Sequence, residues 1–427
     1  MTATPVVAPA VRRRLHPAWL VAATAFIALI GAAGFRAAPG VLMVPLEDEY
    51  GWSRGLLSSA VGVNLVLFGL TAPFAAALMD RFGIRQVITC ALVLISAGSG
   101  LTVFMTASWQ LVLFWGVLVG LGTGSMALAF AATVANRWFV KRRGLVMGVL
   151  TAGSATGQLI FLPMLAWVAE RSGWRTSALI ISAAALLVVP LVILFLRDYP
   201  IDRGVRAYGD LTAEPMVRPP AGRGAASRAM TALFDAAKTR TFWALTIGFA
   251  ICGATTNGLI GTHFIPSAHD HGMAETTAAG LLAVVGIFDI AGTIASGYLT
   301  DRVNPRVLLA IYYGFRGVGL MLLPLLLSDA VHPSIVVFVV VYGLDWVATV
   351  PPTAALCREA FGDTGTIVFG WVFAAHQIGA AFASVAAGFV RDATGQYTIA
   401  WFGAAGMCAI AAVVSLGVGA PARSDGN

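Results

Sequence analysis

Four charged side chains lie within long apolar stretches of this 427-residue sequence, and they are the first candidates for chemistry. They are Arg36, Asp289, Arg316 and Asp345. An ionisable group in an apolar environment is costly unless it is paired or serves to bind a ligand or a proton. Two of the four are basic and two are acidic, so pairing within the set would neutralise it. The pattern therefore indicates binding of a charged ligand, transfer of a proton, or both.

The four charges divide by chemistry. Arg36 is interpreted as the anchor for an anionic group, because a guanidinium binds a carboxylate through two parallel hydrogen bonds. The alternative is an arginine that extends outward to the membrane surface or caps a helix end. Arg316 is interpreted as a structural partner of Asp345 or Asp289, and a substrate contact is the alternative. Asp289 is the first candidate for a proton carrier, since desolvation favours a neutral carboxyl group, but a salt bridge to Arg316 would exclude that role.

Uncharged polar residues in other apolar stretches form a second group of candidates. Asn257 and Gln377 are predicted to hydrogen-bond substrate, although such amides also join helices to one another. His376 is the second candidate for the proton carrier, because an imidazole titrates near physiological pH. Its alternative role is a hydrogen bond to a neighbouring helix. Asn64 and Gln158 belong to the same polar group.

The chain that carries these residues is too apolar for a water-soluble protein. It is 58% hydrophobic and 11% charged, whereas soluble domains average about 25% charged residues. Apolar runs follow one another at residues 18–44, 55–79, 84–105, 109–135, 144–169, 174–196, 242–268, 276–300, 307–327, 334–356, 366–390 and 396–420. A helix of about 20 residues crosses a bilayer. We therefore expect an all-α integral membrane protein with twelve transmembrane helices.

The charges outside the apolar runs predict the orientation of the chain. Most of the 27 basic residues fall in the two tails and in the loops that follow even-numbered runs. The positive-inside rule places such segments in the cytoplasm, so we expect a multi-pass protein of the cytoplasmic (inner) membrane with both termini inside. The expected parts are an N-terminal tail (1–17), a six-helix bundle (18–196), a cytoplasmic linker (197–241), a second six-helix bundle (242–420) and a C-terminal tail (421–427).

The linker is rich in arginine, proline and glycine. Its last stretch, 225–238, is predicted to form a short interfacial helix. Its basic residues either bind lipid or a partner, or simply form a solvated loop that obeys the orientation rule.

The two halves of the sequence repeat each other. Asp80-Arg81 follows the second apolar run and Asp301-Arg302 follows the eighth. The same offset relates further pairs, namely Gly122 with Gly343, Arg137 with Arg358 and Gly144 with Gly365. Two parallel six-helix halves follow from this repeat, with a candidate binding site between them near the middle of the bilayer.

The segment Ala76-x-Leu78-x-Asp80-Arg81-x-Gly83-x-Arg85 resembles the signature between helices 2 and 3 of the major facilitator superfamily, and Gly297-x-Leu299-x-Asp301-Arg302 resembles its second copy. The resemblance covers the whole chain. It implies the major facilitator fold, in which helices 1, 4, 7 and 10 line the cavity, so that Arg36 becomes a cavity residue. A charge lock that holds one access state is the functional interpretation of Asp80 and Asp301, and ordinary loop charges are the alternative. Structural or gating roles are assigned to Asp80, Arg81, Arg85, Asp301, Arg302, Arg316 and Asp345.

Three further segments resemble the monocarboxylate porter and oxalate/formate-type branch of that superfamily. They are Gly51-Trp52-Ser53-Arg54, Trp138-Phe139 with Arg142-Arg143-Gly144, and Thr262-His263 with Pro266. Two landmarks of the animal monocarboxylate porters differ. Gly40 follows Pro39 on helix 1, where those proteins have a lysine, and Thr293 follows Asp289 at the spacing at which they have an arginine.

The favoured function is secondary active transport of a small organic anion, a carboxylate, by alternating access, through either proton symport or anion exchange. The alternatives are a proton-coupled efflux antiporter for drugs or metabolites and a non-transporting membrane receptor or scaffold. An enzyme is not expected, because no H-E-x-x-H segment, nucleophile elbow or metal-spaced cluster occurs. No cofactor or metal is expected, since the four cysteines are scattered. The expected partners are the organic anion, the proton and membrane lipid, without nucleic acid.

Overall fold

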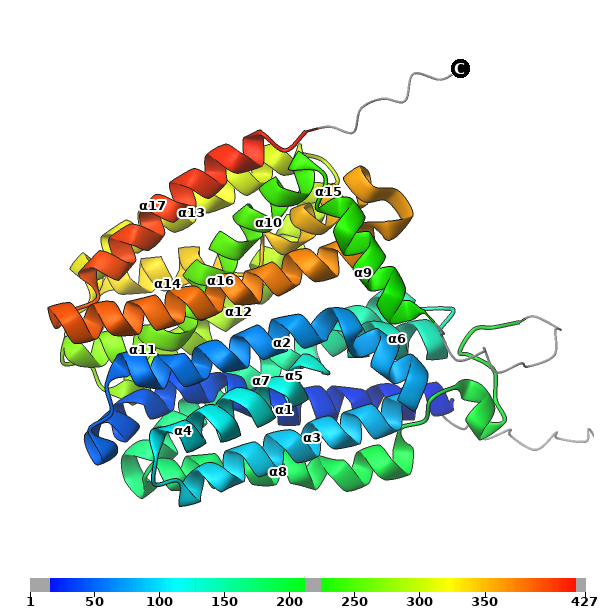
Figure 1. The fold of residues 1–427 in the computed structure, drawn as a ribbon, viewed down its shortest axis with the longest axis horizontal. Coiled ribbons are helices and arrows are strands. Elements are labelled where there is room, and N and C mark those ends of the chain that lie inside the picture. Colours follow the sequence, from blue (N-terminus) through cyan, green and yellow to red (C-terminus); the bar gives the residue numbers. More distant parts are fainter. Residues whose placement is uncertain (1–15, 127, 212–223, 420–427) are drawn as a thin grey trace, which may run out of the picture.

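The protein is built from long helices that lie in two groups (Figure 1). The computed structural model describes residues 16–126, 128–211 and 224–419. Within these residues, ten helical stretches are long and apolar enough to cross a membrane. One of them, Pro333–Thr394, contains two crossings separated by the turn Gly362–Thr364. Helix α7 (Arg143–Ser172) is not among the ten, but its 30 residues are long enough for another crossing. The predicted all-α membrane protein with twelve crossings is confirmed.

The first group, here called the N-half, occupies the lower part of Figure 1. Its fourth crossing is divided into short segments, because the π-helix η2 (Val112–Val119) interrupts the α-helical hydrogen-bond pattern. The helices of the N-half are α1 (Pro17–Tyr50), α2 (Arg54–Phe82), α3 (Ile84–Leu101), α4 (Ser108–Leu111), α5 (Gly120–Gly124), α6 (Leu128–Trp138), α7 and α8 (Trp174–Phe195).

The second group, the C-half, lies above the first in Figure 1. Its first crossing also contains a π-helix, η4 (Ala254–Ile260). The helices are α10 (Arg240–Gly253), α11 (Gly261–Asp270), α12 (Glu275–Thr300), α13 (Pro305–Leu326), α14 (Pro333–Asp345), α15 (Val350–Phe361), α16 (Gly365–Thr394) and α17 (Thr398–Leu416).

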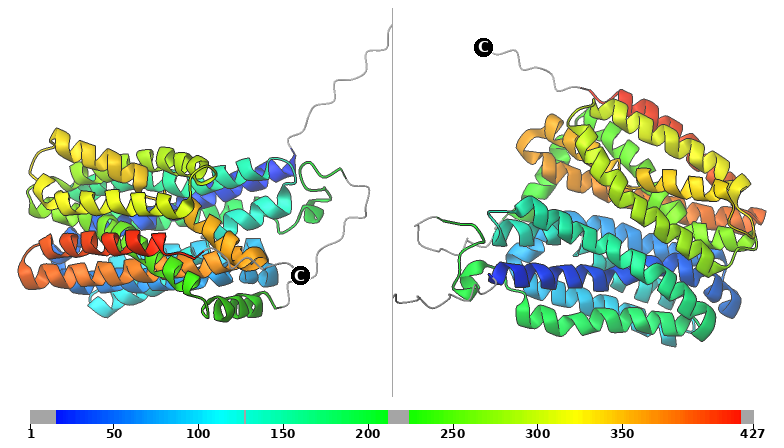
Figure 2. Two further views of the ribbon diagram at one scale, coloured as in Figure 1. Left: turned by 90° about the horizontal axis from the view of Figure 1, so that it is seen from above. Right: turned by 180° about the vertical axis from the view of Figure 1, so that it is seen from behind.

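Helix α9 (Ala225–Ala236) belongs to the linker and contacts both α2 and α16. It lies at the end of the molecule where α1 begins and α17 ends, as two views from other sides also show (Figure 2). We call this end the linker end and the opposite one the far end. The indole N–H of Trp371 donates to the carbonyl of Ala229 over 2.8 Å, which attaches α9 to the C-half.

At the far end, α1 is longer than the apolar run predicts. It continues through an acidic last turn to Tyr50 and ends at Gly51, whose φ of 64° is the left-handed conformation that favours glycine. Ser53 then caps α2, accepting a hydrogen bond from the backbone N–H of Leu56 over 3.3 Å. This tight connection makes Arg54 the first residue of α2.

The tenth crossing is broken just before two prolines. Helix α14 ends at Asp345 and α15 begins at Val350, so residues 346–349 form a non-helical break. Pro351 and Pro352 occupy the first turn of α15. Proline is tolerated there because the N–H groups of a first helical turn have no partner within the helix.

The seam between the halves is formed mainly by α2 and α16, which lie side by side (Figure 1). Glycines of α2 allow the close approach. A Cβ atom at Gly69 would lie 2.7 Å from the Cβ of Gln377 and 3.0 Å from the carbonyl of Ala374. Small residues at such contacts are typical of packed membrane helices. The seam therefore presents Gln377 directly against the N-half.

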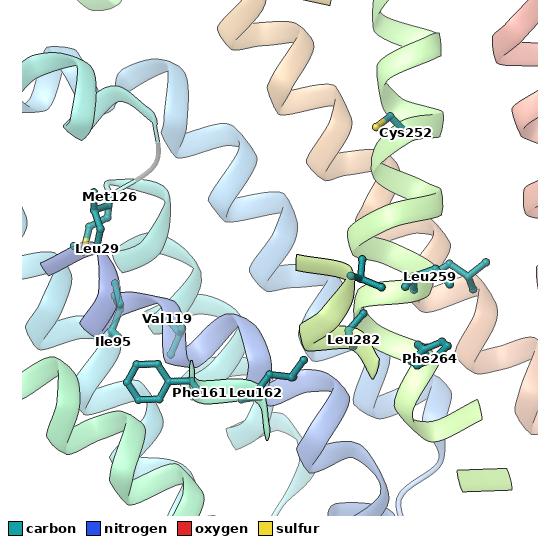
Figure 3. Packing of buried hydrophobic residues seen from close by; sticks show 14 of the residues in the cluster. Leu29, Ile95, Val119, Met126, Phe161, Leu162, Cys252, Leu259, Phe264 and Leu282 are labelled. Carbon is teal, nitrogen blue, oxygen red and sulfur yellow. The ribbon is translucent and has the colours of Figure 1, made fainter. Parts of the chain in front are cut away.

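Each half has its own apolar packing. Leu29, Ile95, Phe161 and Leu162 pack in the N-half, and Leu259, Phe264 and Leu282 pack in the C-half (Figure 3). The side chains of this core are nearly inaccessible to solvent. The buried apolar side chains of both halves belong to one connected cluster, and polar side chains line the cavity between the halves.

Candidate functional site

A cavity lies between the two halves. It encloses about 540 Å³, including space open to solvent. Six helical segments contribute to its lining, and the described lining residues include four amides and no charged side chain. They are Pro39 on α1, Val61, Asn64, Leu65 and Phe68 on α2, Gln158 on α7, Asn257 on η4, Gly261 and Thr262 on α11, and Gln377 on α16.

Gln377 is the most informative of these residues. It is 1% exposed, and neither its amide oxygen nor its amide nitrogen has a hydrogen-bond partner within the described structure. A buried amide without partners costs free energy unless something else completes its hydrogen bonds. A polar ligand in the cavity would do so.

The other amides are positioned by their helices. Asn64 donates its amide N–H to the carbonyl of Trp115 over 2.9 Å, which ties α2 to η2. Asn257 belongs to a π-helix, a distortion often found at functional sites. The hydroxyl of Thr262 donates to the carbonyl of Asn257 over 3.0 Å. The predicted pair Asn257 and Gln377 therefore lines one cavity.

Arg36 is a residue of α1, but its side chain lies outside the described part of the structure. Its helix position is one turn before Gly40. Gly40 meets the C-half, since a Cβ there would lie 3.2 Å from the carbonyl of Gly261. Pro39, on the same turn as Gly40, lines the cavity. The backbone of Arg36 thus lies on the turn next to the cavity.

A second polar cluster closes the far end, and we call it the far-end latch. Arg54, with a 4% exposed side chain, donates from Nη1 and Nη2 to the two carboxylate oxygens of Asp270 over 2.9 and 2.8 Å. It also donates to Glu47 on its own half over 2.7 Å. Arg391 binds Asp270 as well, over 2.7 Å. The carboxylate of Asp392 accepts the backbone N–H groups of Arg54 and Gly55 over 3.0 and 2.8 Å and so caps α2 from α16.

His263 and Tyr397 extend the latch inward. The guanidinium of Arg54 donates to the Tyr397 hydroxyl over 3.1 Å. The His263 ring lies between that hydroxyl, 3.1 Å from Nδ1, and the carbonyl of Ser384, 2.8 Å from Nε2. A neutral imidazole with its proton on Nε2 satisfies both contacts. Burial raises the pKa of Tyr397 to about 12, so the phenol keeps its proton and donates it to His263.

The latch joins the halves at the far end of the molecule. Among the described residues, the ion pair between the N-half and the C-half is that of Arg54 with Asp270. Hydrogen bonds between the halves also lie there, including that of the Thr276 N–H to Glu170 over 2.9 Å. At the linker end the contact is apolar, with the rings of Phe74 and Trp371 edge to face at 5.5 Å. At the far end, the two halves are therefore joined by an ion pair.

A third cluster surrounds the break in the tenth crossing. Arg316, fully buried, pairs with Asp345 over 2.6 Å and donates to the backbone carbonyls of Asp345 and Trp346 over 2.7 and 3.3 Å. Ser296 donates to the carbonyl of Ala348 over 2.5 Å. Of the two partners expected for Arg316, the structure therefore selects Asp345. Side chains of α12 and α13 satisfy the carbonyls that the break releases.

Asp289 lies at the same break. Its carboxylate accepts the N–H of Val347 over 3.0 Å and the hydroxyl of Thr293 over 3.1 Å. No ion pair of Asp289 occurs among the described residues, so the salt bridge to Arg316 that would exclude a proton-carrying role is not formed. His376 is placed differently. Its ring stacks on Phe373 at 5.7 Å, beside Phe249.

The loop motifs are placed at the linker end of the halves. Asp80 pairs with Arg137 over 2.5 Å within the N-half, so this contact joins α2 to α6 and not one half to the other. The backbone N–H of Arg85 donates to Asp198 over 3.2 Å, and Arg81 lies over the ring of Phe82. In the second copy Arg302 lies over Tyr298. Asp301 has no ion pair among the described residues, so the two copies are not equivalent.

Sequence reasoning missed the latch. Arg54 and Asp270 sit at helix ends, where charges are ordinary, and their partners lie far away in the chain. One signal was present: the segments Gly51-Trp52-Ser53-Arg54 and Thr262-His263 with Pro266, noted separately, converge at the latch. Arg54 donates to the carbonyl of Pro266 over 3.4 Å, and the Ser58 hydroxyl lies 3.5 Å from the His263 ring.

Comparison with known proteins gives a consistent picture. The family model described as Major Facilitator Superfamily matches residues 24–369. The chain is 26% identical over 388 residues to the uncharacterized MFS-type transporter YcxA of Bacillus subtilis, covering 89% of this chain and 90% of that protein. It is 29% identical over 395 residues to Monocarboxylate transporter 13 of Rattus norvegicus, covering 89% and 84%. It is 27% identical over 396 residues to Monocarboxylate transporter 11 of Mus musculus, covering 89% and 82%.

Two solved structures share the fold at low identity. One is a bacterial homolog to the human lysosomal transporter Spinster in an inward-facing and unoccupied conformation, with a TM-score of 0.73, 16% identity, and coverage of 95% of this chain and 97% of that one. The other is a D-xylose-proton symporter, with a TM-score of 0.69, 14% identity, and coverage of 93% and 97%. At these identities the likeness concerns the arrangement of helices alone.

Proposed function

We propose that this chain, which belongs to the major facilitator superfamily, carries a small organic anion with a carboxylate group. It is a multi-pass membrane protein and a secondary transporter. The observation that carries the proposal is the cavity between the halves, where the partnerless amide of Gln377 lies with Asn257. Its position at the interface of two repeats is where transporters of this architecture bind substrate. The relatives named monocarboxylate transporters support a carboxylate.

The chemistry of the cavity suits an anion only together with Arg36. Amides offer hydrogen bonds but no charge, and an isolated carboxylate among them would lose its hydration without an opposite charge. Arg36 is on the turn of α1 adjacent to Pro39 in the lining. In the proposed site, Arg36 binds the carboxylate through two hydrogen bonds, and Asn257 and Gln377 bind the remaining polar groups.

An efflux antiporter would use an acidic residue in the cavity to bind a cation or a proton. Its candidate, Asp345, pairs with Arg316 and is not among the described lining residues. The proposal therefore keeps the anion as cargo.

Alternating access is proposed to follow from the latch. With the far end held by Arg54 and Asp270, the cavity is reached from the linker end, and transport requires the latch to break while contacts at the linker end form. By the positive-inside rule the linker end faces the cytoplasm, in the cytoplasmic membrane, with both termini inside. The conformation described here is then the inward-facing one.

The coupling is proposed to be proton symport, with anion exchange as the variant. Asp289 remains the first candidate for the proton carrier. Its carboxylate is half-buried, accepts the Val347 N–H at the break of the tenth crossing, and has no ion pair with any residue that the structure describes. Protonation of the Asp289 carboxylate would weaken its hydrogen bond with the Val347 N–H and so loosen the attachment of α12 to the break of the tenth crossing. His376 remains the second candidate. Asp80, Arg81, Arg85, Asp301 and Arg302 keep proposed structural or gating roles at the linker end.

Uptake into proteoliposomes tests the proposal. We expect accumulation of radiolabelled small carboxylates when an inward proton gradient is imposed, and loss of uptake in Arg36→Ala. Arg175→Ala is the matched control, since Arg175 pairs with Glu49 at the surface, within one half. Neutral sugars and organic cations serve as competitor substrates. Transport of these with no carboxylate uptake, or normal affinity in both Arg36→Ala and Arg36→Lys, would overturn the assignment.

A further inference from the structure

A second cavity opens on the outside of the C-half, between α13 and α14. This groove encloses about 880 Å³ and is separate from the cavity between the halves, with which it shares no lining residue. Its walls are apolar side chains that remain largely exposed, such as Phe315 at 62%, Val318 at 59% and Val337 at 61%. Both helices belong to membrane-spanning stretches. The groove therefore opens to the hydrocarbon of the bilayer.

The groove runs from the far end of the protein toward the break in the tenth crossing. Leu326, the last residue of α13, and Ser334, near the start of α14, line its outer part. Arg316 and Asp345 line its inner part. A molecule in the membrane leaflet at the far end thus has a continuous apolar path to a buried ion pair.

One polar atom at the inner part of the groove has no partner. Asp345 is 5% exposed, and its Oδ2 accepts from Arg316, but its Oδ1 accepts no hydrogen bond within the described structure. Arg316 has no donor left for it. Its Nη1 donates to Cys252 over 3.0 Å and lies 3.4 Å from Thr255, and its Nη2 donates to two backbone carbonyls. Asp345, a lining residue of an apolar groove, therefore has a buried carboxylate oxygen without the donor it requires.

We propose that the groove is a binding site for an apolar molecule of the membrane that bears one hydroxyl group. The hydroxyl donates its hydrogen bond to Oδ1 of Asp345, and the apolar body lies along Val341, Phe338 and Leu322. The apolar body makes dispersion contacts with the walls of the groove. The hydroxyl supplies the hydrogen bond that Oδ1 of Asp345 lacks in the described structure. This site is independent of the proposed carboxylate cargo.

Other ligand chemistries fit less well. An ammonium group would meet the guanidinium of Arg316, which lies 2.6 Å from the same carboxylate. A carboxylate would meet Asp345 itself, and like charges at close range repel. A plain hydrocarbon chain would fill the groove but leave Oδ1 of Asp345 without a hydrogen-bond donor. A neutral donor on an apolar body is the complement that the groove lacks.

Photolabelling of the full-length protein in lipid nanodiscs tests the site. The probes are a decan-1-ol that carries a diazirine in its chain and the methyl ether of the same compound, which has no donor. Labelled peptides are identified by mass spectrometry. We expect the alcohol to label α13 and α14 peptides about tenfold more than the ether at equal concentration, a difference of about 1.4 kcal/mol.

Two variants locate the labelling in the groove. Val341→Phe blocks the groove, whereas Val336→Phe places the same side chain on the same helix outside it, and both valines are 41% exposed. Alcohol labelling should fall to the level of the ether in Val341→Phe and remain unchanged in Val336→Phe. Equal labelling of the wild-type protein by alcohol and ether would overturn the proposal, because any chain would then suffice. Full alcohol labelling of a folded Val341→Phe would overturn it as well.

Discussion

Replacing Arg54 by glutamine tests whether the far-end latch holds one access state. Arg54 reaches from the N-half to the C-half partners Asp270 and Tyr397, whereas its contact with Glu47 stays within one half. When the far end opens, only the contacts between the halves are lost. The variant should therefore destabilise the closed far end relative to the open one.

The magnitude follows from what remains after the substitution. Removing one member of a buried ion pair costs about 3–5 kcal/mol when the other charge is left without compensation. Here Arg391 stays on Asp270 at 2.7 Å and keeps much of its charge compensated. We therefore expect a smaller shift of about 2 kcal/mol, within the range of hydrogen bonds to charged groups. This corresponds to about a 30-fold larger population of the far-end-open state.

Labelling of a reporter cysteine measures that population. Leu65→Cys places a thiol in the cavity between the halves, and Cys90→Ser removes the exposed native cysteine. A membrane-impermeant maleimide added at the far end reacts only while that end is open. The labelling rate should rise about 30-fold in Arg54→Gln.

The control is Arg175→Gln, which removes an ion pair of 2.5 Å with Glu49 at the same end of the molecule. That pair lies within the N-half, and its side chains are 43% and 38% exposed, so its loss should leave the labelling rate within about twofold of the wild-type value. A wild-type rate in Arg54→Gln would refute the latch. An equal increase in both variants would show that any charge loss loosens this end.

Three further predictions follow from the other clusters. Gln377→Leu should weaken carboxylate binding about tenfold or more, because the cavity loses one of its four amides, the one without a partner in the described structure. Gln86→Leu on the exposed surface of α3 should leave binding unchanged, and equilibrium binding of the labelled carboxylate to each purified variant tests both expectations. Asp289→Asn should abolish proton-driven accumulation but spare equilibrium exchange, because the amide oxygen still accepts the Val347 N–H but does not bind a proton. A normal pH profile of uptake in this variant would exclude Asp289 as the proton carrier. Arg316→Met should lower the free energy of unfolding by about 3–5 kcal/mol, because it leaves Asp345 buried without its partner. The double variant Arg316→Met with Asp345→Leu should recover part of that loss. Equal melting temperatures of the single and double variants would contradict this expectation.

Much of the architecture is readable from the sequence. The membrane crossings are predicted because a run of about 20 consecutive apolar residues matches the thickness of the hydrocarbon core of a bilayer. The length of such a run is a local property of the sequence. Pro351 and Pro352 predict a bend in the tenth crossing, because proline restricts its own backbone whatever its surroundings. That the helix is interrupted at residues 346–349 is visible only in the structure. Asn257 and Gln377 were candidates on the same local ground, as polar residues in apolar runs.

The pairings were decided only by the tertiary structure. Arg316 had two acidic partners open to it, and helix packing brings it to Asp345 and leaves Asp289 to a backbone N–H. Arg54 looked like an ordinary charge at a helix end, yet it is buried among partners more than two hundred residues away. Distances between side chains that are remote in sequence depend on how whole helices rotate and slide against one another. Hydropathy carries no information on that rotation, which the fit of Gly69 against Gln377 and similar close contacts determines.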